Sequence, residues 1–227
     1  MSVAIVSTRV LSKEQLALFE EQNLAVLDYD FIQFETIENE VNNVHDILLF
    51  TSKNAVEAVR LLANYNELVT KPVVCVGIKT KELLEQYGWT VMAWAHYAKD
   101  LATIIIEDFS TSSFTFFCGN LRRDLLPELF DERKIAYTEY EVYRTVVNAH
   151  QVVEKVDGIC FYSPSGIASY LQNNSITNEV CFCIGDTTAD ALQGITEHIV
   201  LAEYPTIDAT LAACVSYYKL SQLKIDR

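Results

Sequence analysis

The chain has few basic residues and lacks the glycine-rich motifs that bind phosphates. It carries 17 lysines and arginines against 31 acidic residues, giving a net charge of −14. Proteins that bind a nucleic-acid backbone usually carry the opposite charge, so we expect no nucleic-acid partner. The absence of GxGxxG and GxxxxGK[ST] patterns argues against the common dinucleotide-binding and P-loop classes, and no GxSxG elbow indicates a hydrolase serine.

Long hydrophobic runs are also missing. None approaches the ~20 residues of a membrane span, and the N-terminal MSVAIVSTRV lacks the basic segment and cleavage site of a signal peptide. We therefore expect a cytoplasmic protein with no membrane partner. The six cysteines lie in apolar segments without a CxxC motif, so we expect small buried hydrophobic residues rather than metal ligands.

Short β-branched runs alternate with helical patterns from one end of the chain to the other. Such alternation is typical of an α/β fold with largely parallel sheets and right-handed crossovers. The expected strands cover 3–8, 24–29, 46–51, 73–77, 90–95, 114–118, 136–143, 157–162, 180–185 and 198–202.

The second half of the chain repeats motifs of the first. FTSKNAVEAV at 50–59 resembles FYSPSGIASY at 161–170, and VGIKTKELLEQYGW at 76–89 resembles IGDTTADALQGITE at 184–197. Ten strands would be near the upper limit for one twisted sheet. We therefore predict two pseudo-equivalent lobes, each a five-stranded parallel sheet flanked by helices in a flavodoxin-like arrangement.

Two stretches, DFIQFE at 30–35 and EVYRTV at 141–146, alternate apolar and polar residues as half-exposed ribbons do. We expect them to form a two-stranded β linker between the lobes. The predicted division is a discontinuous lobe of 1–30 and 147–227, an inserted lobe of 36–140, and linker strands at 31–35 and 141–146.

Small hydroxyl-bearing residues follow many of the expected strands, where open α/β sheets bind their ligands. Helix starts at these turns attract anions, each contributing roughly 0.3–1 kcal/mol. N-capping by serine or threonine, worth ~1 kcal/mol, explains any single turn without a ligand. Six such turns, with basic residues close behind several of them, favour an anionic ligand. The basic residues are Arg9, Lys53, Lys79, Lys81, Lys99, Arg122 and Arg123.

Taken in order, five motifs resemble the uroporphyrinogen-III synthase family over nearly the whole chain. They are FCGNLRRDLLPEL at 117–129, EVYRTV at 141–146, FYSPSG at 161–166, IGDTTADAL at 184–192 and AEYPT at 202–206. The resemblance implies two lobes with a cleft between them, and a lyase of haem biosynthesis that needs no metal or organic cofactor. Its substrate would be hydroxymethylbilane, a linear tetrapyrrole with eight carboxylates. The product would be uroporphyrinogen III, formed by loss of water, inversion of ring D through a spiro intermediate, and ring closure.

The resemblance also implies roles for individual residues. Tyr143 in VYRT matches the cleft tyrosine, a candidate general acid, because a phenol keeps its proton at neutral pH and can donate it. A linker tyrosine that only packs between the lobes is an equal alternative. The residues expected to bind substrate are Arg9, Thr51, Ser52, Thr80, Gly119, Arg122, Ser163, Ser165, Thr187 and Thr188. For Arg122 the alternative is a charge on a helix surface.

Two positions depart from the family pattern. Val10 stands where a proline often follows the TR pair, and Asp186 stands in the threonine turn, where a carboxylate would repel an anionic substrate unless it caps the helix. One alternative function is a two-lobed module that binds a small anion without catalysis. Another, for which Asp186 is the only indication, is a structural or regulatory paralogue that has lost activity. In either case we expect a monomer.

Overall fold

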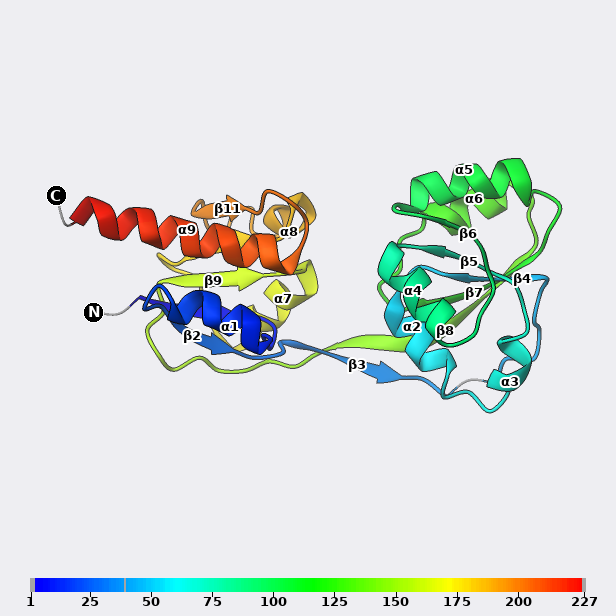
Figure 1. Ribbon diagram of the computed structural model, residues 1–227, viewed down its shortest axis with the longest axis horizontal. Helices are drawn as coiled ribbons and strands as arrows, with labels where there is room; N and C mark the ends of the chain where they lie inside the picture. The colour runs from blue at the N-terminus through cyan, green and yellow to red at the C-terminus, as the bar shows by residue number, and fades with distance from the viewer. Residues whose placement is uncertain (1–2, 39, 226–227) are drawn as a thin grey trace. The chain divides into compact units, whose positions relative to one another are not determined.

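The computed structural model describes residues 3–38 and 40–225, with side chains up to residue 219. The chain forms two compact units, one of Met1–Gln33 with Val146–Arg227 and one of Phe34–Thr145. Each unit is an α/β domain with its own sheet (Figure 1). The predicted α/β class, with parallel sheets flanked by helices, is confirmed.

The first unit has a five-stranded sheet in the order β11-β10-β9-β1-β2, with all neighbouring strands parallel. Its strands begin and end within the predicted apolar runs. Its elements are β1 (Ala4–Ser7), α1 (Lys13–Glu20), β2 (Ala25–Asp28), β9 (Gly158–Phe161), α7 (Pro164–Asn173), β10 (Val180–Cys183), α8 (Asp186–Asp190), β11 (Ile199–Leu201) and α9 (Ile207–Ile225).

Both faces of this sheet are buried, which is why its strands read as continuous apolar runs. Ile5 packs with Phe19 of α1 and Leu211 of α9 on one face. The next residue of β1, Val6, packs with Ile167 of α7 on the other face. Alternate side chains of one strand therefore fix helices on opposite sides of the sheet, and Figure 1 shows α1 and α9 together on one of these sides.

The second unit has a six-stranded sheet in the order β3-β8-β7-β4-β5-β6. Helices α2 and α4 pack on one face, and α5 and α6 on the other. Its elements are β3 (Ile32–Thr36), β4 (Ile47–Phe50), α2 (Lys53–Val59), α3 (Tyr65–Leu68), β5 (Val73–Val76), α4 (Ile78–Gln86), β6 (Val91–Ala95), α5 (Ala98–Asp108), β7 (Phe114–Gly119), α6 (Leu125–Arg133) and β8 (Tyr137–Val147).

The two stretches expected as separate linker strands belong to this second sheet. β3 forms its edge beside β8. The predicted strand at 136–143 and the predicted linker strand at 141–146 are one continuous strand of 11 residues, β8. Neither strand is deeply buried: β3 is exposed from Gln33 to Thr36, and Val142 is the one buried residue of β8.

The cysteines have the character expected from their apolar surroundings. All six are free and buried. Burial raises the pKa of the Cys75 thiol to about 12 and that of Cys118 to about 11. These two thiols are therefore neutral at neutral pH and pack as small hydrophobic groups. Among the helices within 3–38 and 40–225, none is both long and apolar enough to cross a membrane.

Candidate functional site

A hollow of about 290 Å³ lies at the carboxyl ends of β4 and β7 in the second unit, beside β8. Ligands of open α/β sheets bind at this end of the strands. The lining of the hollow includes five of the residues expected from the sequence. They are Thr51, Ser52, Gly119, Arg122 and Tyr143.

Ser52 begins helix α2 at the rim of this hollow. Its backbone is extended, and its Oγ accepts a hydrogen bond from the backbone N–H of Asn54 at 3.1 Å. The cap satisfies one amide of the first helical turn, whose other N–H groups have no acceptor within the helix. Ser52 therefore caps α2, and substrate binding at this turn stays a prediction.

Tyr143 lies on β8 with its ring half-buried. The edge contact of its ring with Phe34 has a centroid separation of 6.0 Å. The ring also packs against the hydrophobic cluster beneath α2 and α4. Over the described part of the chain, no hydrogen-bond partner is found for its hydroxyl, which is left available to a ligand in the hollow.

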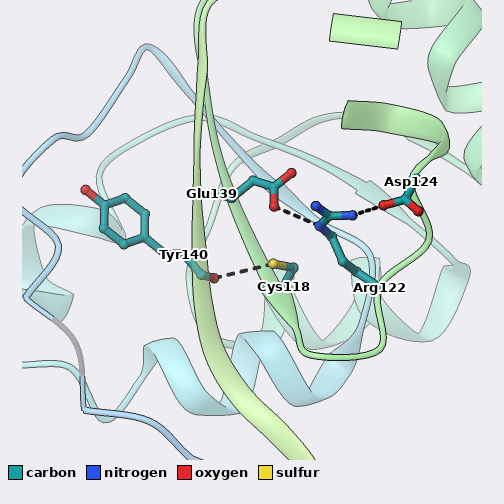
Figure 2. Close-up of polar contacts among 5 residues, drawn as sticks. All are labelled: Cys118, Arg122, Asp124, Glu139 and Tyr140. Carbon is teal, nitrogen blue, oxygen red and sulfur yellow. Dashed lines mark hydrogen bonds and ion pairs between the residues drawn. The ribbon is translucent and has the colours of Figure 1, made fainter. Parts of the chain in front are cut away.

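Arg122 contributes a cation that is already held by two carboxylates (Figure 2). Its Nε donates to Oε2 of Glu139 at 2.7 Å, and a terminal nitrogen donates to Asp124. Burial alone would lower the pKa of Arg122, but the hydrogen bonds to these carboxylates outweigh it and raise that pKa. The other oxygen of Glu139 is buried without a partner within the described residues. Arg122 is therefore a fixed positive charge rather than a freely moving surface residue.

The turn that carries Arg122 is tied to β8. Asn120 exchanges two hydrogen bonds with the backbone of Thr145, one at 2.9 Å to its Oδ1 and one at 3.3 Å from its Nδ2. The backbone N–H of Arg122 donates to the carbonyl of Gly119 at 3.1 Å. These bonds fix the loop between β7 and α6 at the edge of the hollow.

Thr80 lies outside the lining of the hollow. It is buried, and its N–H donates to the carbonyl of Gly77 at 3.1 Å. Gly77 begins helix α4 with a φ of +90°, a conformation that favours glycine. Thr80 therefore stabilises the turn after β5.

In the first unit, the serine pair stands at the start of α7. Ser163 Oγ accepts from the N–H of Gly166 at 3.1 Å and lies 2.9 Å from Ser165 Oγ. Both serines are half-buried or exposed at the helix start. The turn after β9 thus repeats the capping geometry of Ser52.

The threonine turn follows the neighbouring strand, β10. Thr188 is buried and donates its N–H to the carbonyl of Gly185 at 3.0 Å, whereas Thr187 is exposed. Asp186 lies in the first turn of α8, where a negative charge is favoured by the helix dipole. Gly185 stands at the N-cap position, so Asp186 is the first residue inside the helix and not its cap.

Arg9 is exposed after β1. Its carbonyl accepts from Ser7 Oγ at 2.7 Å, and that Oγ also lies 3.0 Å from the hydroxyl of Tyr162. Burial raises the pKa of Tyr162, so its hydroxyl remains protonated in this contact. The backbone of the Arg9 turn is therefore held, and its side chain is free to reach solvent.

Several residues of the hollow were not expected from the sequence. Tyr97, Leu121 and Leu125 are exposed hydrophobic side chains in its lining, together with His96. Arg123, one of the basic residues that the sequence places behind a strand end, also lines the hollow. Tyr97 follows β6, the strand next to β5, and Leu121 follows β7. Their positions after strand ends are the sequence feature that could have identified them as lining residues. Apolar residues at such positions do not by themselves indicate a ligand.

A second hollow, of about 440 Å³, lies on the first unit. It is lined by residues that precede β9 and β10, including Val156 and Glu179. It therefore lies at the amino ends of the strands, away from the hydroxyl-bearing turns. The hollow of the second unit is the better candidate site.

Comparison with known proteins decides the family. The model of the family described as uroporphyrinogen-III synthase HemD matches residues 14–212. The chain belongs to the uroporphyrinogen-III synthase family. It is accordingly a lyase of tetrapyrrole biosynthesis, and a binding module without catalysis is not favoured.

Solved structures of this family share the fold. Uroporphyrinogen-III synthetase from Helicobacter pylori is similar with a TM-score of 0.73 and 19% identity, over 96% of this chain and 100% of that one. A mutant uroporphyrinogen III synthase from the extremely thermophilic bacterium Thermus thermophilus has a TM-score of 0.64 and 16% identity, over 98% and 100% of the two chains. Both units are therefore part of the fold of the uroporphyrinogen-III synthase family.

Proposed function

We propose that this protein converts hydroxymethylbilane to uroporphyrinogen III, with loss of water, inversion of ring D and ring closure. Family membership supports the reaction. The hollow of the second unit is the observation from which we assign the reaction to particular residues. There, a phenol without a described partner, a helix start and two arginines line one apolar space.

The size of the hollow suits part of the substrate. Small-molecule pockets commonly measure roughly 300–1,000 Å³, and this one measures about 290 Å³. We propose that it holds one pyrrole ring of the tetrapyrrole against Leu121, Leu125 and Tyr97. The polar carboxylate arms of that ring would then reach the rim.

The rim offers two kinds of carboxylate partner. The first is the start of α2, beside Thr51 and Ser52. The N–H groups of its first turn form the positive end of the helix dipole, which favours an anion. The second is the arginine pair. Arg122 keeps N–H groups beyond the two that already bind carboxylates, and Arg123 lines the same hollow. Charge-assisted hydrogen bonds of this kind contribute roughly 1.5–3 kcal/mol each.

In the first unit, Ser163, Ser165, Thr187 and Thr188 form two turns at the ends of adjacent strands. We propose that the exposed groups of these two turns, with Arg9, bind carboxylates of the substrate, and that the buried Thr188 holds its turn in shape. Asp186 weakens the threonine turn as an anion site, because its carboxylate adds negative charge there.

Tyr143 is the proposed proton donor. The C–O bond of the hydroxymethyl group breaks, and the hydroxyl leaves as water with the phenol's proton. The electron-deficient carbon left behind is attacked by the substituted carbon of ring D, which gives the spiro intermediate. The older bond from that ring carbon to the methylene bridge of ring C then breaks, and the bridge carbon bonds to the unsubstituted α-carbon of ring D, which inverts the ring and closes the macrocycle. A proton released on final ring closure restores the phenol. Most of the acceleration comes from holding the substrate in a bent conformation.

We further propose that the protein acts as a cytoplasmic monomer. The six free, buried cysteines are compatible with a reducing compartment, in which disulfides are rare.

The test is a coupled assay that supplies freshly made hydroxymethylbilane and separates the type I and type III isomers. The unassisted reaction closes the substrate without inversion and gives type I. We expect the protein to give type III as the main product. Type I alone, at the rate without protein, would rule out the proposed activity, and binding without turnover would indicate an anion-binding module.

A further inference from the structure

A shift in strand register aims the side chain of Tyr143. β7 and β8 pair in step as far as Cys118 and Glu141, and then Gly119 pairs with Tyr143, so Val142 is skipped. Successive side chains of a regular strand point to opposite faces of the sheet. Here the consecutive residues Val142 and Tyr143 both pack against the cluster beneath α2 and α4. An extra residue of this kind is a β-bulge, a device that re-aims side chains beside active sites.

The ring of Tyr143 also occupies the space that a side chain at position 119 would need. A methyl group added to Gly119 would lie 2.6 and 2.8 Å from the two Cε atoms of Tyr143, and closer still to its Cζ. Carbon atoms in ordinary contact are roughly 3.5–4.0 Å apart. The hydroxyl-bearing end of the ring therefore lies directly on the glycine.

The backbone does not require a glycine at this position. The glycines with positive φ are Gly77, Gly88 and Gly194, and Gly119 is not among them. Any residue could adopt its backbone conformation. What excludes other residues is the ring of Tyr143, which needs position 119 to be empty.

The first unit lacks this arrangement of a ring over an empty position. By sheet order β1 corresponds to β7, and Thr8 follows the last residue of β1. Thr8 is buried, and its Oγ1 donates to the carbonyl of Cys160 at 2.8 Å. The strands β1 and β2 pair in step, with no register shift. The bulge and the empty position thus occur together, in the unit that carries Tyr143.

We propose that Gly119 is a positioning residue for the phenol of Tyr143, and that it does not act by binding substrate through its own backbone. The inference rests on the proposed role of Tyr143 as proton donor. The bulge turns the ring toward the hollow, and Gly119 lets it lie against the strand, with Phe34 at 6.0 Å along its edge. An alternative is that an aromatic ring over a strand glycine only stabilises the sheet.

A double-mutant cycle separates these possibilities. We expect Gly119→Ala to lower kcat roughly 100-fold, because displacing a reacting group by about 1 Å has that order of effect. Tyr143→Phe removes the proton donor while keeping the ring. If Gly119 acts only through the phenol, adding Gly119→Ala to Tyr143→Phe causes no further loss of kcat. A full additional loss in the double variant would instead show that Gly119 contacts the substrate.

Folding is checked separately from activity. Gly185→Ala is the matched control for stability, since its added methyl group would meet nothing closer than 4.0 Å. We expect Gly119→Ala to lower Tm more than Gly185→Ala does, and adding Tyr143→Ala to Gly119→Ala to remove the steric part of that loss. If Gly119→Ala lowers Tm but leaves kcat unchanged below the transition, the glycine is only structural and the proposal is wrong.

A direct readout does not depend on turnover. The α-proton resonances of Gly119 should be shifted upfield by the ring in the wild-type protein, and Tyr143→Leu should abolish that shift. If Tyr143→Phe itself leaves kcat unchanged, the proposed role of the phenol fails, whatever the NMR shift shows. If Tyr143→Phe reduces kcat but the Gly119 shift is absent, the positioning inference alone fails.

Discussion

The two units carry the same strand-end turns and differ in what stands beside them. Ser52 and Ser163 each cap the helix that follows the central strand, β4 or β9. Thr80 and Thr188 are each buried, and each donates its N–H to a glycine carbonyl three residues earlier. The repeated sequence thus gives two copies of one backbone framework.

The likeness ends at the next strand. Thr8 follows β1, and its hydroxyl donates a hydrogen bond to the carbonyl of Cys160 in the neighbouring strand β9. Gly119 is the last residue of β7, and the ring of Tyr143 lies against it. The second unit also has the hollow lined by exposed hydrophobic side chains and two arginines. Duplication therefore supplies the turns that we propose to bind anions twice, and the group proposed for proton transfer stands in one unit.

Removing one tyrosine hydroxyl from each unit tests most directly whether the two units have different roles. Tyr143→Phe should reduce turnover roughly 100-fold or more, because proton donation contributes 10²–10⁴-fold. Tyr162→Phe, at the end of β9, removes a hydroxyl that bonds Ser7 and should affect stability by about 1 kcal/mol with little effect on turnover. Steady-state kinetics and thermal melts measure both. Equal loss of turnover in the two variants would contradict the division of roles.

Alanine variants of the arginines test whether Arg122 mainly stabilises the protein or mainly binds the substrate. Arg122→Ala should lower the free energy of unfolding by about 1–3 kcal/mol, because Glu139 already has one buried oxygen without a described partner and would lose its bond to the other. Arg123→Ala should change stability by under about 0.5 kcal/mol but raise KM roughly 10-fold. Denaturant titrations and kinetics provide the two values. Arg9→Ala is the exposed counterpart in the first unit, and a stability loss there as large as that of Arg122→Ala would be unexpected.

The capping serines should behave alike in stability and differently in binding. Ser52→Ala and Ser163→Ala should each cost about 1 kcal/mol of folding free energy, because each removes one N-cap hydrogen bond. Ser52 lines the hollow, so its loss should raise KM more than the loss of Ser163. Chemical denaturation and substrate titrations measure the two effects. A larger KM effect at Ser163 would place the main carboxylate contacts in the first unit.

A smaller effect is expected at the opposite, amino ends of the strands. Asp46 accepts hydrogen bonds from the side chain and backbone of Ser113, which hold the pKa of its carboxyl below the ordinary value. A lowered folded-state pKa stabilises the protein above the unfolded pKa of about 3.9, and this stabilisation is lost as pH falls through the lower folded value. Asp46→Asn should therefore flatten the dependence of unfolding free energy on pH below about pH 4. An unchanged slope for Asp46→Asn would rule out this contribution.

Many of the turns that carry candidate binding residues could be predicted from the sequence. Hydroxyl residues after apolar runs identified the turns at Ser52, Ser163, Thr80 and Thr188, because helix starts need caps and parallel strands place those starts at one edge. The sequence could not say which of these side chains turn inward. Thr80 and Thr188 are buried in their turns, because their neighbours in three dimensions decide exposure.

The sequence also did not show how β8 pairs with β7 or which carboxylate binds Arg122. The stretch 136–146 reads as two short strands, and only pairing with β7 joins it into one strand with a register shift at Gly119. From the sequence, Arg122 is a candidate substrate-binding residue or a charge on a helix surface, and only the fold brings Glu139 from a different element within 2.7 Å of it. Both contacts join residues separated along the chain, and no local pattern encodes them.

By itself, the sequence determined the alternation of strands and helices, the duplication and the family, because periodicity, turn residues and motif order are local properties. Tertiary structure decided which turns line a hollow, which arginine is already bound to carboxylates, and why position 119 must lack a side chain. These outcomes depend on steric exclusion and charge pairing between residues that meet only after the sheet has formed.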